Sequence, residues 1–262
     1  MEKPKVVILC GGMGTRMNKE TEFMPKPLVN VGSHPILWHI MKTYSHYGFN
    51  DFVLCLGYKG DMIKNYFRNF HSHVKDYTFN LRTRDKIFHG DTEIPDWNIT
   101  FANTGLHSNT GCRIKKIEKH ITGDNFMVTY GDGVADINIP ELLNYHRTHG
   151  KVGTVTTVRP STRFGNLTIN EHGQILDFTK KTKIHEGWID GGFFVFNKKI
   201  FDYLTEDPDC MLEREPLKQL ASEQQFMSYK HKGFWQCMDT TRDHQHLNNI
   251  WKSNQVPWRV WR

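Results

Sequence analysis

The sequence predicts an α/β fold, a Rossmann-like sandwich with a mixed, mainly parallel central sheet and helices on both faces. Three short apolar runs, residues 6–10, 51–57 and 126–130, have the composition of strands buried on both sides. Segments with helical spacing of apolar residues separate these runs, so that strand and helix alternate. The first and third runs end in glycine-rich turns, which is where open α/β sheets bind ligands.

Local periodicity predicts the other elements. Apolar residues recur every three to four positions in the expected helices, and short runs rich in β-branched or aromatic residues mark the expected strands. The sequence Asn-Glu-His-Gly at 170–173 indicates a hairpin turn between two such runs. The predicted helices are 35–47, 61–70, 113–121, 139–149, 200–204, 213–222 and 241–252, and the further strands are 97–102, 154–158, 166–169, 174–178 and 193–196.

The chain of 262 residues is expected to form a single domain, because no repeat and no linker-like tract interrupts it. At about residue 151 the pattern changes from helix–strand alternation to short β runs. At about residue 236 it turns towards a closing helix and a tryptophan-rich tail. We therefore expect a core of about 1–150, a small β-rich part of about 151–235, and a closing segment of about 236–262.

The composition of the chain indicates which kind of ligand it binds and in which compartment it is expected. Lys and Arg exceed Asp and Glu by 34 to 28, a net charge of +6 that suits anionic ligands. The basic residues form no dense block, which argues against nucleic acid. No apolar run approaches the roughly 18 residues of a membrane span, and the N-terminal run is too short for a secretory signal. The five cysteines form no C-x-x-C pair, as in a cytoplasmic protein.

A glycine-rich turn follows the first predicted strand, in the sequence Gly-Gly-Met-Gly-Thr-Arg at 11–16. Glycines let the backbone approach a phosphate, and Arg16 can hold phosphate oxygens in a bidentate contact. The spacing matches neither the P-loop nor the dinucleotide fingerprint. Lys26 lies between two prolines, which present its charge rigidly. The alternative for both segments is an ordinary surface loop.

Two aspartates are candidates for a magnesium site. Asp132, between two glycines, ends the third buried strand, and Mg²⁺ typically takes one or two carboxylates together with substrate phosphates. The alternative for Gly-Asp-Gly is a simple turn. Asp239 is the best candidate for a second carboxylate, since it follows an apolar run and precedes a helix. Asp243 is expected in the first turn of that helix.

Taken together, these motifs resemble the sugar-1-phosphate nucleotidyltransferase family, and within it the members that use CTP. The resemblance runs over nearly the whole chain. It rests on segments 11–17, 25–27, 35–41, 57–60, 110–113, 129–136, 163–165, 191–194, 215–216, 233–236, 238–240 and 257–258.

The resemblance implies a nucleotidyltransferase fold and transfer of CMP from CTP to a small phosphorylated acceptor, first of all glucose 1-phosphate. In that reading the core binds the nucleotide and the β-rich part binds the acceptor. Arg16, Lys26 and Asp132 would be catalytic, and Asp132 and Asp239 would hold Mg²⁺. The resemblance assigns the nucleotide to Gly11, Gly12, Gly14, Thr15, Arg16, Lys26, Thr110, Arg113 and Asp132, and the acceptor to Thr179, Lys180, Asp190 and Gly191.

Departures from the family pattern leave alternatives open. Position 24 is Met in place of the usual Lys, position 112 is Cys in place of Gly, Thr179 replaces a Glu that accepts hydrogen bonds from sugar hydroxyls, and Asp190 replaces Asn. A changed acceptor pocket predicts another sugar phosphate, a polyol phosphate or another small phosphorylated metabolite. Conversely, Asp190 can take over the lost carboxylate's role and leave glucose 1-phosphate as the acceptor.

Three further readings remain. The nucleotide can be another pyrimidine triphosphate, such as UTP or dTTP. The chain can be a non-catalytic nucleotide-binding relative, although Arg16, Lys26, Asp132 and Asp239 are all present. The tryptophan-rich tail fits either core packing or a subunit contact, and we expect a homo-oligomer.

Overall fold

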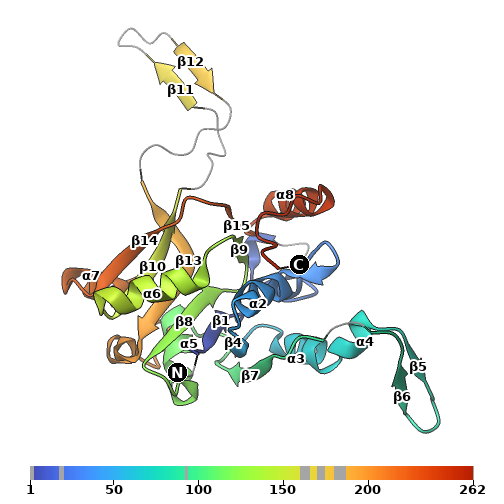
Figure 1. Cartoon of the computed structure of the whole chain (residues 1–262). Coiled ribbons are helices and arrows are strands. Elements are labelled where there is room, and N and C mark those ends of the chain that lie inside the picture. Colours follow the sequence, from blue (N-terminus) through green and yellow to red (C-terminus); the bar gives the residue numbers. More distant parts are fainter. Residues whose placement is uncertain are drawn as a thin grey trace.

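The computed structural model describes residues 3–17, 21–91, 94–159, 166–169, 175–179 and 187–261. At residues 16, 166–169 and 175–179 it describes the backbone alone. A seven-stranded sheet runs through these residues (Figure 1). The strand antiparallel to its neighbours is β13, whereas the other pairs in the sheet are parallel. This confirms the mixed, mainly parallel sheet. Its order is β14 (Phe226–Lys230), β10 (Gly153–Val158), β13 (Ile189–Asn197), β8 (Asn125–Tyr130), β1 (Val6–Leu9), β4 (Asp51–Leu56) and β7 (Asn98–Asn103).

Helices cover both faces of the sheet, because successive side chains of a strand point to opposite sides. Val6 and Ile8 of β1 belong to one buried cluster, and Val7 and Leu9 belong to the other. Helices α2 (Ile36–His46), α3 (Gly60–Arg68), α6 (Ile139–His149) and α8 (Thr241–Lys252) contribute to the first cluster, and α5 (Thr110–Lys116), η4 (Lys198–Tyr203) and α7 (Glu215–Ser222) contribute to the second.

Most predicted elements are present, but several helices differ from their expected bounds. The helix expected at 113–121 is α5, which starts at Thr110 and is followed by the 3-10 turn η3 (Glu118–His120). The helix expected at 61–70 is broken after Arg68, and α4 (Phe70–Val74) continues from it. Neither boundary carries a side-chain cap in the structure, so no local residue marks a sharp stop.

Three strands of the expected β-rich part, β10, β13 and β14, extend the central sheet. The predicted hairpin is present as β11 (Asn166–Ile169) and β12 (Ile175–Thr179), which pair antiparallel, while its turn at 170–173 lies outside the described residues. We did not predict β14, whose Phe-Met-Ser-Tyr-Lys sequence is mixed because the strand forms an edge of the sheet.

A second hairpin was also not predicted. β5 (Tyr77–Phe79) pairs antiparallel with β6 (Lys86–Phe88) and projects from the body of the molecule next to α4 (Figure 1). All six of its strand residues are exposed, including three aromatic rings. Within the described part of the chain, no helix is long and apolar enough to span a bilayer.

The C-terminal tail packs against the N-terminal half of the fold. Trp258 is fully buried, and its indole N–H donates to Nδ1 of His39 on α2 at 3.5 Å. The ring of Trp261 lies 5.7 Å from that of Trp38, edge to face. The tail therefore completes the core around α2, which is one of the two roles that the sequence left open.

Candidate functional site

Three segments that are distant in sequence bring a lysine and two aspartates together. Lys26 opens the 3-10 turn η2 (Lys26–Leu28), and Asp132 lies two residues after the end of β8. Asp239 follows β15 (Trp235–Cys237), which pairs antiparallel with β9 (Gly133–Ala135). The amide of Met238 also donates to the carbonyl of Asp132 at 2.8 Å. This pairing places Asp239 beside Asp132.

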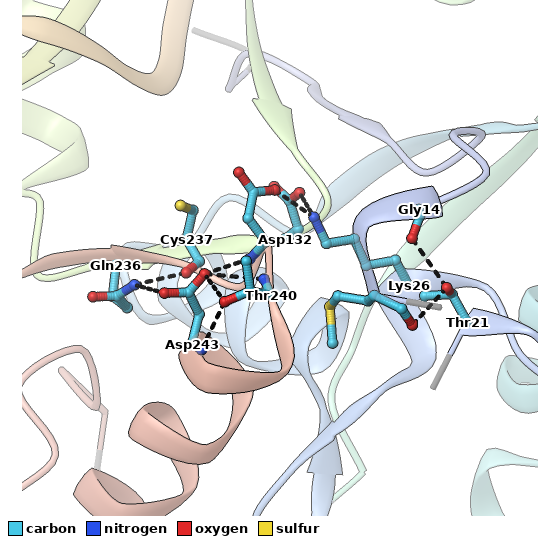
Figure 2. Close-up of polar contacts among 10 residues, drawn as sticks. Gly14, Thr21, Lys26, Asp132, Gln236, Cys237, Thr240 and Asp243 are labelled. Atoms are coloured by element: carbon cyan, nitrogen blue, oxygen red, sulfur yellow. Dashed lines mark hydrogen bonds and ion pairs between the residues drawn. The ribbon is translucent and has the colours of Figure 1, made fainter. Parts of the chain in front are cut away.

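The ammonium group of Lys26 lies between the two carboxylates (Figure 2). Its Nζ is 2.6 Å from Oδ2 of Asp132 and 2.7 Å from Oδ1 of Asp239. Burial of Lys26 disfavours its charge, but the two ion pairs outweigh burial and raise the pKa of Lys26 above its usual value. Lys26 is thus a fixed cation at the carboxyl edge of the sheet.

The neighbouring Asp243 has a structural role, as the sequence predicted. Its carboxylate accepts hydrogen bonds from the amide and the hydroxyl of Thr240, and the hydroxyl of Thr240 accepts from the amide of Asp243 (Figure 2). This capping box starts α8 immediately after Asp239. The start of the helix therefore fixes the backbone that carries Asp239.

Arg113 supports the glycine-rich loop from beneath. Its side chain is buried, and Nη2 donates to the carbonyl of Gly11 at 3.0 Å. A Cβ atom on Gly11 would lie 2.2 Å from this guanidinium, so the contact requires glycine. The guanidinium N–H groups of Arg113 therefore donate hydrogen bonds to protein oxygens. The resemblance implied instead that Arg113 binds the nucleotide. Its further acceptors are the carbonyls of Leu56, Gly105 and Leu106 and the hydroxyl of Thr104.

A pocket of about 330 Å³ opens above this loop. The hydroxyl of Thr21 anchors one rim by donating to the carbonyls of Gly14 and Met17. Arg16 lies in η1 (Thr15–Met17), with its side chain outside the described part. Of the residues predicted to bind the nucleotide, the pocket is lined by Gly11, Gly12, Gly14, Thr15, Lys26, Thr110, Arg113 and Asp132.

The predicted acceptor residues are described only in part. Asp190 and Gly191 lie on β13, and the indole of Trp235 on β15 donates to the carbonyl of Gly191 at 2.7 Å. β13 is therefore tied to the segment that leads to Asp239. Thr179 ends β12, and Lys180 lies outside the described residues, so neither can be placed against the pocket.

The sequence analysis missed two residues at the site. The hydroxyl of Tyr130 is 3.3 Å from Oδ2 of Asp190 and 2.5 Å from Oε1 of Glu213. Tyr130 directly precedes Gly131 and Asp132, so its position in the motif was a usable signal. Glu213 carried no signal, because the fold alone brings the loop before α7 to this place.

The two carboxylates fit a divalent cation of the magnesium type. Asp132 and Asp239 supply hard oxygen ligands that already converge on one charge, the Lys26 ammonium. In the described part of the chain no group of three or more His, Cys, Asp or Glu side chains converges as a metal site. Mg²⁺ commonly takes few protein ligands and completes its shell with phosphate oxygens and water.

A fold of this kind, with a glycine-rich loop, a fixed lysine and paired aspartates at the carboxyl edge of its sheet, belongs to enzymes that handle nucleotides. Residues 5–248 match the family model of nucleotidyl transferases, and the chain belongs to this family. It is 44% identical to glucose-1-phosphate cytidylyltransferase of Salmonella typhi, over 98% of this chain and 99% of that protein. It is also 44% identical to the probable glucose-1-phosphate cytidylyltransferase of Bacillus subtilis, over 98% of this chain and all of that protein.

Solved structures agree on the fold. A putative glucose-1-phosphate thymidylyltransferase from Bacillus anthracis superposes with a TM-score of 0.69 at 16% identity, covering 95% of each chain. A UDP-glucose pyrophosphorylase complexed with UDP-glucose gives a TM-score of 0.66 at 16% identity, covering 96% of this chain and 99% of that one. The predicted family and fold class are confirmed.

Proposed function

We propose that the chain transfers CMP from CTP to glucose 1-phosphate, forming CDP-glucose and pyrophosphate. The observation that carries the proposal is Lys26, held between Asp132 and Asp239 at the mouth of the pocket. The near full-length similarity to cytidylyltransferases that use glucose 1-phosphate supports the choice of substrates.

In this reaction an oxygen of the acceptor phosphate bonds to the α-phosphorus of CTP, and the bond from that phosphorus to the bridging oxygen breaks. Both reactants are anions, so catalysis depends on positioning and charge neutralisation. Lys26 presents its ammonium to the α-phosphoryl group, and Arg16 holds the leaving pyrophosphate. Gly11, Gly12, Gly14 and Thr110 line the pocket. We assign the phosphates to the backbone of the three glycines and the base to the side of Thr110.

Asp132 and Asp239 would hold Mg²⁺. When bound, the ion neutralises phosphate charge and orients both reactants. The ammonium of Lys26 lies between these carboxylates, so part of the positive charge that the phosphates need belongs to the protein itself. Thr179, Lys180, Asp190 and Gly191 would receive the acceptor, with Lys180 on its phosphate.

The test is pyrophosphate release by the purified chain with Mg²⁺, glucose 1-phosphate and CTP, UTP or dTTP in turn. We expect turnover with CTP to exceed that with the other nucleotides by at least an order of magnitude. Turnover with UTP or dTTP but not with CTP would refute the proposal that CTP is the nucleotide substrate. Calorimetric binding of CTP without turnover on any sugar phosphate would favour the non-catalytic alternative.

The acceptor needs its own test, because Thr179 and Asp190 differ from the family pattern. If these residues redirect the pocket to another phosphorylated acceptor, the double substitution Thr179→Glu and Asp190→Asn increases activity on glucose 1-phosphate. If glucose 1-phosphate is the acceptor, as we propose, the wild-type chain uses it well and the double variant brings no gain.

We also propose that the enzyme works in the cytoplasm as a homo-oligomer, without nucleic acid or membrane partners. Its five cysteines are free thiols, which suits a reducing compartment. The β5–β6 hairpin exposes Tyr77, Phe79, Ile87 and Phe88, the kind of surface that association covers. Light scattering after size-exclusion chromatography measures the molar mass in solution. A monomeric wild-type protein would refute the proposed homo-oligomer, and Ile87→Lys is expected to lower the fraction of protein that is oligomeric.

A further inference from the structure

A second cavity lies at the edge of the central sheet opposite to Lys26 and Asp132. Its volume is about 460 Å³, larger than the pocket above the glycine-rich loop. Lys5, which precedes β1, and Asn125, which begins β8, both line it. Since β1 and β8 run parallel, the cavity lies at their amino ends, whereas the proposed active site lies at their carboxyl ends. No described residue lines both, so the two are separate sites.

Positive charge predominates around this cavity. Of the described residues that line it, Lys3, Lys5 and Arg147 are cationic, and Asp124 is the acidic one. Arg147 lies in the last turn of α6 and is exposed, and its guanidinium has no hydrogen-bond or ion-pair partner in the described part of the chain. The excess of cations predicts an anionic ligand, and a guanidinium with free donors matches the oxygens of a phosphate.

The protein itself holds the two lysines in place. Nζ of Lys3 donates to the carbonyl of Tyr47 at 3.1 Å and lies 5.4 Å from the centre of the Phe49 ring. Nζ of Lys5 lies 3.7 Å from Oδ2 of Asp51, which offsets part of its charge. An ammonium group has three N–H donors, so each lysine keeps donors for a ligand.

The side-chain amide of Asn125 has a fixed orientation. Its Oδ1 lies 3.3 Å from Nε2 of His146 and 3.3 Å from Nδ2 of Asn197. Asn197 presents its NH₂ group there, because its own Oδ1 accepts from the amide of Lys199 at 3.1 Å. The NH₂ group of Asn125 has no partner among the described residues and is not sealed inside the protein. It therefore remains as a donor for the cavity that Asn125 lines.

A chain of hydrogen bonds behind Asn125 fixes the same orientation. Burial lowers the pKa of His146 to about 4 and that of His149 below its usual value, so both rings are neutral at pH 7. The amide of Lys151 donates to Nδ1 of His149 at 2.9 Å, so Nε2–H of that ring donates to the hydroxyl of Thr154 at 2.7 Å. Thr154 then donates to Nδ1 of His146 at 2.8 Å, and Nε2–H of His146 donates to Asn125. Each donor in this chain leaves one role for the next group, and Asn125 must accept with its oxygen.

We propose that this cavity binds phosphate, as the free ion or as the phosphate group of a small metabolite. Lys3 and Arg147 neutralise the charge of the phosphate, and the NH₂ group of Asn125 donates to one of its oxygens. A volume of about 460 Å³ is in the range of small-molecule sites, so an organic group fits beside the phosphate. The site is independent of the proposed function, because it takes no residue from the active site.

Titration with inorganic phosphate, followed by NMR of ¹⁵N-labelled protein, tests the site directly. The side-chain NH₂ signals of Asn125 are identified from their loss in Asn125→Asp. We expect these signals to shift and to saturate as phosphate is added to the wild type. Signals of Asn125 that do not respond to phosphate would overturn the proposal.

Two variants test the donors, with the backbone amide of Gly123 in the cavity wall as the reporter. Arg147→Met removes a charged donor at an exposed position and is expected to weaken phosphate binding about 10-fold or more. Asn125→Asp keeps an oxygen for His146 but turns the NH₂ donor into a charged oxygen, so it is expected to weaken binding at least as much. Unchanged affinity in either variant would overturn the site.

The matched controls make the same charge changes at exposed positions outside the cavity. Arg68→Met removes a cation whose Nη2 donates to Asn65 on α3, and Asn249→Asp adds a carboxylate on α8. Both are expected to bind phosphate as the wild type does. Urea unfolding of the four variants verifies that each is folded. A loss of affinity in the controls as large as in Arg147→Met and Asn125→Asp would show that net charge alone is responsible, and would overturn the site.

Glucose 1-phosphate, titrated in the same way, distinguishes the two sources of the phosphate group. Binding about 10-fold tighter than that of inorganic phosphate supports a metabolite, whose organic group then contributes about 1.4 kcal/mol. Equal affinity supports the free ion. None of these measurements needs turnover, so a wild-type chain that fails to use CTP and glucose 1-phosphate refutes the proposed function and leaves this site untouched.

Discussion

The Nζ atom of Lys26 lies 2.6 Å from Oδ2 of Asp132, so the cation proposed to meet the α-phosphoryl group is also a counter-ion of a proposed metal ligand. Lys26→Met is expected to lower kcat/KM about 10²–10³-fold, the usual cost of losing one such transition-state contact. It should also tighten binding of Mn²⁺ to the free enzyme, because the two carboxylates lose their internal counter-ion.

Steady-state kinetics and calorimetry with Mn²⁺ check both parts. Lys64→Met is the matched control, since Lys64 forms an i,i+3 pair with the exposed Asp61. Unchanged turnover in Lys26→Met would contradict the proposed role of Lys26.

Asp239 and Asp243 are close in sequence but predicted to act differently. Asp239→Asn removes a proposed metal ligand, so the Mg²⁺ concentration for half-maximal activity is expected to rise about 10-fold or more. Asp243→Asn weakens the capping box of α8 and is expected to lower the free energy of unfolding by about 1 kcal/mol or more, since its carboxylate is buried. Magnesium titrations and urea unfolding of both variants make the comparison. An unaltered Mg²⁺ requirement in Asp239→Asn would remove Asp239 from the metal site.

Arg113 is expected to matter for the shape of the loop. Arg113→Lys keeps the charge but has fewer donors and no planar fork, so buried carbonyls of the loop lose their partner. The free energy of unfolding is expected to fall by about 2–4 kcal/mol, with a raised KM for CTP. Chemical denaturation and kinetics measure the two effects. A variant as stable as the wild type, with only its CTP binding impaired, would show that Arg113 binds the nucleotide directly.

Because His39 is buried, we expect the free energy of unfolding to fall in mild acid. Burial lowers its pKa to about 4, and the ring bonds to the carbonyl of Val31 and the indole of Trp258. Below the unfolded pKa near 6.5, the unfolded chain binds a proton that the folded chain does not, so stability falls as pH falls from about 6.5 towards 4. Between pH 7 and pH 5 this loss is about 2 kcal/mol.

Urea unfolding at the two pH values tests this. His39→Gln, which keeps a donor and an acceptor, is expected to lose less stability between pH 7 and pH 5 than the wild type. His71→Gln, at an exposed position, serves as the control. An identical pH dependence in all three proteins would exclude His39 as the source.

The sequence predicted the parts of the site that short local motifs mark. Asp132 was recognisable because it follows an apolar run, and Lys26 because two prolines flank it; pairing of β15 with β9 then brought Asp239 to them. The role of Arg113 was not predictable, because its partners are carbonyls distributed along the chain. Glu213 was missed for the same reason: nothing local distinguishes it from an exposed helix-start residue.

The strands buried on both faces were predicted, and so was the edge strand β7, whereas β14 and the β5–β6 hairpin were not. β1, β4 and β8 have continuous apolar sequences, whereas β14 and the β5–β6 hairpin mix polar and apolar residues without a clear period. Tertiary pairing, rather than local preference, makes these segments strands.

The contact between Trp38 and Trp261 has a consequence for the order of events during synthesis. The face of α2 that His39 and Trp38 share stays uncovered while the ribosome makes the middle of the chain, since Trp258 lies 219 residues after His39. Contacts so distant in sequence form late. The nascent chain therefore carries an open tryptophan-lined face until Trp258 and Trp261 have been made, and a ribosome that stops before Trp258 releases a product that cannot close its core.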